Sequence, residues 1–239
     1  ISVKILFLIY YTFMNYHFIL LMFFWYLLQV DVSGSFLIYN TLFPMYKKIR
    51  KQIQKQITEQ YINEPKQKLI ISTPAGLHGF YLMGVTRFIK ENYNLSDFIF
   101  SGASAGSWNS LFLCFQGNDS EFIENILNSE IYDATSINQI EKTMKKIILE
   151  KYNQSQDLFL FDKVSIGVTT YRFPLNFRLK IYQNFSTLED TLDCCVASSH
   201  IPFITGNILH KYKKEFSFDG GFFSYPYLNT TTPVLRISP

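Results

Sequence analysis

Short apolar runs alternate with amphipathic segments along residues 68–239, and most runs end in small or turn-forming residues. Strands are predicted for KLIIST (68–73), DFIFSG (97–102), VSIGVTTY (164–171), FRLKIYQNF (177–185), KEFSFDGG (214–221) and PVLRIS (233–238). Helices are predicted over 80–93, 105–115, about 119–130, 136–152 and 187–198. Strands separated by helices indicate an α/β fold, with a mainly parallel central sheet covered on both faces.

The first 44 residues form a hydrophobic N-terminal segment, and residues 45–67 form a polar helical linker. Ile5–Val30 is almost unbroken in its apolar character and longer than the about 20 residues that cross a bilayer as one helix. Two interpretations of residues 1–44 stay open: a membrane anchor, or translated upstream sequence, since the segment does not begin with Met and Met45 opens the part of the chain that follows it. With an anchor, the basic run KKIRKQIQK (47–55) places the following domain in the cytosol, so the expected localisation is membrane-associated.

Composition narrows the class of protein. Of the 239 residues, 48% are hydrophobic and 18% aromatic, which indicates a folded chain that can bury one substantial core. A net charge of +3 is too small to predict a nucleic-acid partner. The three cysteines lack zinc-ligand spacing, and reduced thiols are expected. The chain ends at Pro239 just after an apolar run, so a domain over 68–239 that is truncated at its C-terminus is a further expectation.

Residues 102–106, Gly-Ala-Ser-Ala-Gly, match G-x-S-x-G, the pattern of a nucleophile held on a tight strand-to-helix turn. Gly102 and Gly106 provide clearance where strand and helix backbones approach closely, and Ala103 and Ala105 add little bulk. A predicted strand precedes the match and a predicted helix follows it. The pattern therefore predicts Ser104 as a nucleophile, against the alternative of a serine in a packed small-residue turn.

A serine hydroxyl needs a base, and the chain offers two kinds. Asp219 follows a predicted strand and precedes Gly220 and Gly221, so its carboxylate can lie close to the end of another strand. In dry surroundings such a carboxylate can accept the hydroxyl proton. An ordinary Asp-Gly turn is the structural alternative. His200 and His210 are the only histidines after Ser104, and they keep a histidine-dependent esterase of the α/β-hydrolase type open.

A third stretch, STPAGLHGFYLMG (72–84), predicts a strand end, a Gly-containing loop and a helix start. Such a loop presents unpaired backbone N–H groups towards negative charge. An acyl-transfer enzyme needs such donors for the oxyanion of its tetrahedral intermediate.

These three stretches, in this order, resemble the patatin-like phospholipase family, as does ASSHIPF (197–203). The resemblance implies a three-layer α/β/α fold and a Ser104–Asp219 dyad without a catalytic histidine, metal or cofactor. It also implies a phospholipase A or acylglycerol lipase activity on lipids at a membrane or lipid-droplet surface. Ala75, Gly76 and Leu77 then correspond to the oxyanion loop.

The chain departs from the family in that loop. The family's three leading glycines appear here as Pro74, Ala75 and Gly76, and its basic residue appears as His78. Pro74 has no N–H and cannot donate to an oxyanion. A catalytically impaired lipid-binding protein is therefore the alternative from another functional class.

Overall fold

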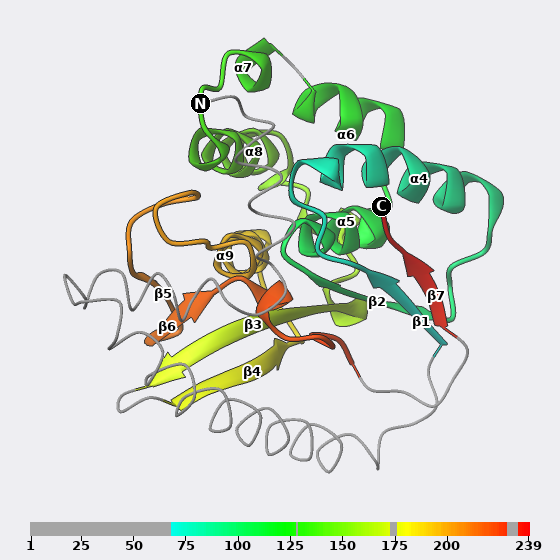
Figure 1. Ribbon diagram of the computed structural model, residues 1–239. Helices are drawn as coiled ribbons and strands as arrows, with labels where there is room; N and C mark the ends of the chain where they lie inside the picture. Colours follow the sequence, from blue (N-terminus) through cyan, green and yellow to red (C-terminus); the bar gives the residue numbers. More distant parts are fainter. Residues whose placement is uncertain (1–67, 128, 173–175, 229–233) are drawn as a thin grey trace, which may run out of the picture. The chain divides into compact units, whose positions relative to one another are not determined.

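The computed structural model describes residues 68–127, 129–172, 176–228 and 234–239 (Figure 1). The hydrophobic segment 1–44 and the polar linker 45–67 lie outside the described residues. The strands are β1 (Lys68–Ser72), β2 (Phe98–Ala103), β3 (Val164–Arg172), β4 (Asn176–Tyr182), β5 (His210–Tyr212), β6 (Glu215–Phe218) and β7 (Val234–Ile237). The helices are α4 (Gly79–Asn92), α5 (Ala105–Cys114), α6 (Asp119–Ile126), α7 (Ser129–Tyr132), α8 (Ile137–Tyr152) and α9 (Leu188–Ser198). Short 3-10 turns are η1 (Gly76–His78), η2 (Gln156–Leu158), η3 (Phe161–Lys163) and η4 (Gly220–Phe222).

The strands form one mixed sheet whose centre is parallel. Strands β7, β1, β2 and β3 lie side by side in that order, and each neighbouring pair is parallel. Strands β4 and β6 pair with β3 in antiparallel fashion, and β5 continues the sheet beyond β6. The predicted parallel centre is confirmed, and an antiparallel extension is added to it.

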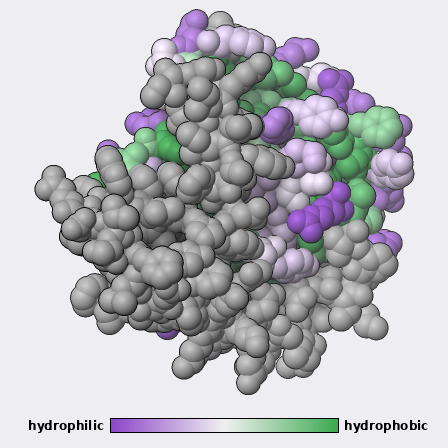
Figure 2. All heavy atoms as spheres, in the orientation of Figure 1, coloured by the Kyte–Doolittle hydropathy of each residue, from purple (hydrophilic) through white to green (hydrophobic). Residues whose placement is uncertain are grey.

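The helices of the described residues all pack on one face of the sheet, as Figure 1 shows for α4, α5, α8 and α9. Ile70, Phe100 and Ile166 project from neighbouring strands into the core that these helices share. On the opposite face, Leu69 and Ile71 pack against Tyr227. Figure 2 shows polar residues over much of the coloured surface, with hydrophobic residues between them.

The described residues therefore lack the second helical layer that the sequence predicts. The physical reason is the order of the parallel strands. The chain moves from β1 to β2 to β3 in one direction across the sheet. Right-handed crossovers then place every connecting helix on the same face. After β6, Tyr227 and Leu228 cover the strands on the other face.

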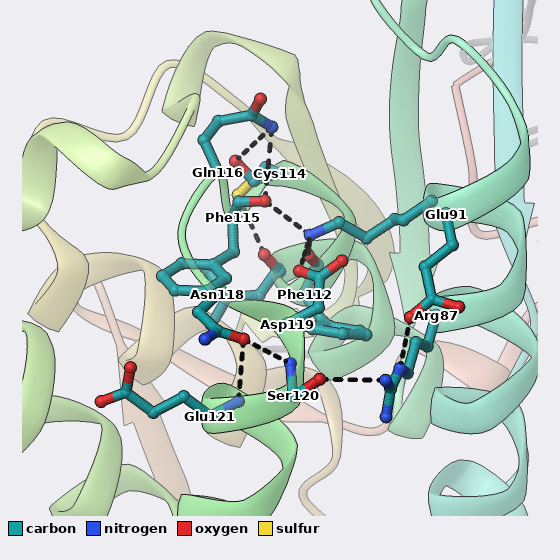
Figure 3. Close-up of polar contacts among 12 residues, drawn as sticks. Arg87, Glu91, Phe112, Cys114, Phe115, Gln116, Asn118, Asp119, Ser120 and Glu121 are labelled. Atoms are coloured by element: carbon teal, nitrogen blue, oxygen red, sulfur yellow. Dashed lines mark hydrogen bonds and ion pairs between the residues drawn. The ribbon is translucent and has the colours of Figure 1, made fainter.

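Lys90 of α4 closes the C-terminal end of α5. Its Nζ donates to the carbonyl oxygens of Phe112 (2.9 Å) and Phe115 (2.5 Å) and lies 2.6 Å from Oδ1 of Asp119. Figure 3 shows these oxygens converging at the end of the helix. A cation at this position satisfies the last carbonyls and complements the helix dipole. The far end of the helix that begins after Ser104 is thereby anchored.

Within the part of the chain that the structure describes, every helix is too short or too polar to cross a membrane.

Candidate active site

Ser104 occupies the turn between β2 and α5. Its backbone angles are φ 55° and ψ −132°, a conformation that costs a non-glycine residue about 1–3 kcal/mol. Serine is a preferred N-cap residue, yet the Ser104 side chain makes no capping hydrogen bond to α5. The backbone is held in a strained conformation, and the hydroxyl is directed away from its own helix.

The two glycines of the predicted elbow are required by close backbone approaches. A Cβ on Gly102 would lie 2.1 Å from the carbonyl oxygen of Gly106. A Cβ on Gly106 would lie 2.0 Å from the carbonyl oxygen of Ser72, at the end of β1. Both contacts are with backbone atoms, which cannot rotate away. The glycines thus allow β1, β2 and α5 to meet around Ser104.

The topology of β3 brings Ser104 and Asp219 together. One edge of β3 is taken by β4, and the other edge is shared by β2 and β6. Strand β2 ends with Ala103 opposite Gly167, while β6, running the other way, ends with Phe218 opposite Thr169. The two strands approach each other end to end along one edge. Ser104 Oγ donates to Oδ2 of Asp219 at 2.6 Å.

Hydrogen bonds to both its carboxyl group and its backbone hold Asp219 in place. Oδ1 accepts from the backbone N–H of Gly221 at 2.6 Å, and Oδ2 accepts from Ser104. The Asp219 N–H donates to the carbonyl of His200 at 2.8 Å, and its carbonyl accepts from Oγ1 of Thr169 at 2.8 Å. The carboxylate orientation towards the serine hydroxyl is therefore preorganised.

Burial makes Asp219 more basic than an ordinary aspartate. Ser104 is 3% exposed and Asp219 is 1% exposed. Loss of solvation raises the pKa of Asp219 to about 7, although the hydrogen bonds from Ser104 and Gly221 act in the lowering direction. A carboxylate with this pKa is a far better proton acceptor near neutral pH than a solvated one.

Ser198, at the end of α9, is a residue that sequence reasoning did not assign. Its Oγ accepts from the backbone N–H of Ser104 at 2.8 Å and donates to the carbonyl of Gly167 at 2.7 Å. The hydroxyl therefore ties the strained turn to β3. The sequence did hold a signal for this residue, because Ser198 lies in ASSHIPF (197–203), one of the stretches that resemble patatin-like phospholipases.

The predicted oxyanion loop lies beside the same turn. Gly106 approaches the carbonyls of Ser72 and Thr73 closely, and a Cβ on Gly79 would lie 2.9 Å from Cβ of Ala105. The loop therefore flanks the start of α5. Its Gly76 has φ 54°, a conformation that suits glycine.

The N–H groups of Ala75, Gly76 and Leu77 have no hydrogen-bond acceptor among the described residues. Those of Ala105 and Gly106, in the first turn of α5, also lack one there. The second pair was not assigned to this role from sequence, although the residue after a nucleophile commonly supplies such a donor. Two sets of amide donors thus flank the serine.

Neither candidate histidine is hydrogen-bonded to Ser104 in the part of the chain that the structure describes. His200 contributes its backbone carbonyl to Asp219, and burial lowers the pKa of its ring to about 4. His210 Nδ1 lies 2.8 Å from Oγ of Ser217. The observed partner of the serine hydroxyl is the carboxylate of Asp219.

Within residues 68–127, 129–172, 176–228 and 234–239, no three His, Cys, Asp or Glu side chains cluster as metal ligands would.

Comparisons with known proteins identify no family for this chain. No family model and no curated protein matches it. Among solved structures, VipD from Legionella pneumophila is similar over 72% of this chain and 49% of its own, at 12% sequence identity and a TM-score of 0.47. This chain thus matches about half of the length of VipD. The chemistry of the site therefore rests on its own residues.

Proposed function

We propose that this chain is a serine hydrolase that cleaves fatty-acyl esters of lipids, of phospholipase A or acylglycerol lipase type. The observation that carries the proposal is the 2.6 Å hydrogen bond from Ser104 Oγ to a buried Asp219 carboxylate. The lipid substrate class rests on the resemblance of the three motifs and ASSHIPF to patatin-like phospholipases.

In the first half of the reaction, Ser104 Oγ attacks the acyl carbonyl carbon while Asp219 Oδ2 takes the hydroxyl proton. The carbonyl oxygen becomes an oxyanion, and the tetrahedral intermediate collapses with cleavage of the ester bond. The departing alcohol takes the proton from Asp219, and an acyl-serine remains. In the second half, water attacks the acyl-serine and gives a proton to Asp219. Collapse releases the fatty acid, and Ser104 regains its proton.

Backbone amides are the donors for the oxyanion in this proposal. The N–H groups of Ala75, Gly76 and Leu77 flank the turn from one side, and that of Ala105 lies at the start of α5. Such donors, aimed where charge develops, are each worth about 10²–10³ in rate. Pro74 supplies none, and its ring lies against Gly221 of the Asp219 loop. In this chain Pro74 therefore acts as a packing residue.

A fluorescent phosphonate tests the proposal directly, because it reacts covalently only with an activated serine. We expect the wild-type chain to be labelled and Ser104→Ala to stay unlabelled. A panel of phospholipids and acylglycerols, with release of fatty acid as the readout, then identifies the substrate. Absence of labelling in the wild-type chain would instead support a catalytically impaired lipid-binding protein, the alternative that Pro74 and Ala75 motivate.

The reaction should depend on pH through Asp219. Because its carboxylate is the base and its pKa is about 7, kcat/KM should rise about tenfold per pH unit below neutrality and level off above it. The buried Glu141 carboxyl, which contacts Ser199, has a pKa raised to about 9 by loss of solvation and stays protonated across this range. Hydrolysis of a soluble, non-ionising ester measures the profile. A profile that is flat from pH 5 to 8 would show that Asp219 is not the base.

A further inference from the structure

The loop between α9 and β5, which contacts Asp219 at its beginning, exposes apolar side chains. Phe203 is 57% exposed, Ile208 45% and Leu209 55%, although the loop also contains buried residues such as Ile201. Other exposed large apolar residues lie elsewhere, such as Tyr81 and Phe88 on α4 and Tyr132 on α7. Three such side chains thus lie within seven residues of one loop, and we name this part of the loop the 203–209 surface.

The exposure is built into the loop by a network of hydrogen bonds. Thr205 Oγ1 accepts from the backbone N–H of Ile201 at 2.8 Å and lies 3.2 Å from the carbonyl of Ser199. The N–H groups of Ile204 and Thr205 both donate to the carbonyl of Ile201. Phe203 has φ 66°, which is unfavourable for a bulky residue. The loop thus holds the Phe203 ring outward at an energetic cost.

The loop is connected to the candidate catalytic pair at its beginning. Ser198 binds the backbone N–H of Ser104, and the carbonyl of His200 accepts from the N–H of Asp219. The 203–209 surface begins three residues after His200. The 203–209 surface therefore belongs to the same loop segment that contacts Ser104 and Asp219.

The charge of the segment favours an anionic partner. Between Ser198 and Glu215 the chain has lysines at positions 211, 213 and 214 and no carboxylate side chain. All three lysines are exposed, and Lys213 pairs with Asp190 at 3.0 Å. Lys213 and Lys214 also have positive φ angles, 43° and 68°, in the tight turn between β5 and β6. Exposed apolar side chains flanked by lysines are the composition that binds anionic lipid surfaces.

We propose that the 203–209 surface, with Lys211 and Lys214, docks the protein on the surface of an anionic phospholipid bilayer. The proposal rests on the proposed function for its choice of partner, and it adds the element that presents the lipid to the site. Phe203, Ile208 and Leu209 insert among the acyl chains near the headgroups, and the two lysines lie against the lipid phosphates.

A fluorophore in the loop tests the docking in the full chain. The three native cysteines are buried, so Leu209→Cys accepts a thiol-reactive, environment-sensitive dye selectively. On phosphatidylcholine vesicles that contain phosphatidylserine, we expect its emission to increase and shift to the blue. The same dye on Tyr132→Cys, in α7, should not respond. This control distinguishes insertion of the 203–209 surface from vesicle binding through another segment of the chain. Absence of a response at position 209, or an equal response on pure phosphatidylcholine, would overturn the proposal.

Substitutions separate docking from chemistry. We expect the triple variant F203S/I208S/L209S to lower hydrolysis of vesicle phospholipid at least about tenfold more than hydrolysis of a soluble short-chain ester. Lys211→Gln and Lys214→Gln should each weaken binding to the anionic vesicles about fivefold. The double variant Y81S/F88S, on α4, is the matched control. It should change neither the ratio of vesicle hydrolysis to soluble-ester hydrolysis nor the binding to anionic vesicles. Vesicle hydrolysis without a dye response would refute docking alone, and a dye response without hydrolysis of any ester would refute the proposed function alone.

Discussion

Ser104→Ala and Asp219→Asn should each lower ester hydrolysis by at least about 10³-fold, the scale seen when a nucleophile or its base is removed from a serine hydrolase. Alanine removes the hydroxyl oxygen that becomes acylated in the proposed reaction. Asparagine keeps the shape of the side chain and its contact with Gly221 but cannot take the Ser104 proton. Fatty-acid release under saturating lipid, and kcat/KM on a soluble ester, measure the loss. The double variant should be no slower than the slower single variant, because the two residues act as one unit.

Stability distinguishes loss of chemistry from loss of folding in these variants. Burial raises the pKa of Asp219 to about 7, above its value in the unfolded chain. Its contribution to stability is therefore full at acidic pH below the unfolded pKa and is lost as the pH rises through about 7. Asp219→Asn removes this pH-dependent loss, so at pH 8 it should unfold at the same or a higher temperature than the wild type.

Ser110→Ala is the matched serine control, because the Ser110 hydroxyl is buried on α5 without a hydrogen-bond partner among the described residues. It should keep full activity. Substantial hydrolysis by Ser104→Ala would exclude the dyad. A loss of activity in His210→Asn equal to that in Asp219→Asn would instead favour the histidine-dependent esterase.

Gly106→Ala and Gly102→Ala should destabilise the protein by about 3 kcal/mol or more and lower the remaining activity about 10²-fold. The added Cβ would lie 2.0 Å from the Ser72 carbonyl oxygen in the first variant and 2.1 Å from the Gly106 carbonyl oxygen in the second. Relief of either overlap requires β1, β2 or α5 to shift, and this moves Ser104 relative to Asp219. Urea unfolding followed by circular dichroism measures the change in the free energy of unfolding.

Gly84→Ala provides the control for these glycine variants. Gly84 lies within α4, and a Cβ there would meet nothing within 4 Å. Alanine is favoured over glycine in a helix interior by about 1 kcal/mol, so this variant should be more stable than the wild type. If Gly106→Ala were as stable as Gly84→Ala, the close packing of the turn on β1 would be wrong.

The helices and most strands could be predicted because each has its own local signal. At the start of α9 the sequence offers Ser186 or Thr187 as the helix cap, and in the structure Thr187 accepts from the N–H of Asp190. Ile70 and Phe100 lie in short apolar runs that form buried parallel strands. Strand β5 was not predicted, because His210–Tyr212 is too short to show a period. The described residues place helices on one face of the sheet, whereas the sequence predicts helices on both. The face that a helix covers depends on the order in which the chain adds strands across the sheet, and no single segment of the sequence carries that order.

By itself, the sequence predicted the tight strand-to-helix turn: glycines at positions 102 and 106, with a strand before and a helix after, made Ser104 the candidate nucleophile. The sequence also made Asp219 a candidate base, but alongside two histidines. Only the tertiary structure shows that, of the three, the Asp219 carboxylate is hydrogen-bonded to the Ser104 hydroxyl. Strands β2 and β6 share one edge of β3 and end facing each other, so residues far apart in sequence meet within 2.6 Å. The raised pKa of Asp219 also depends on the tertiary structure, because segments that are distant along the chain exclude water from its carboxyl group.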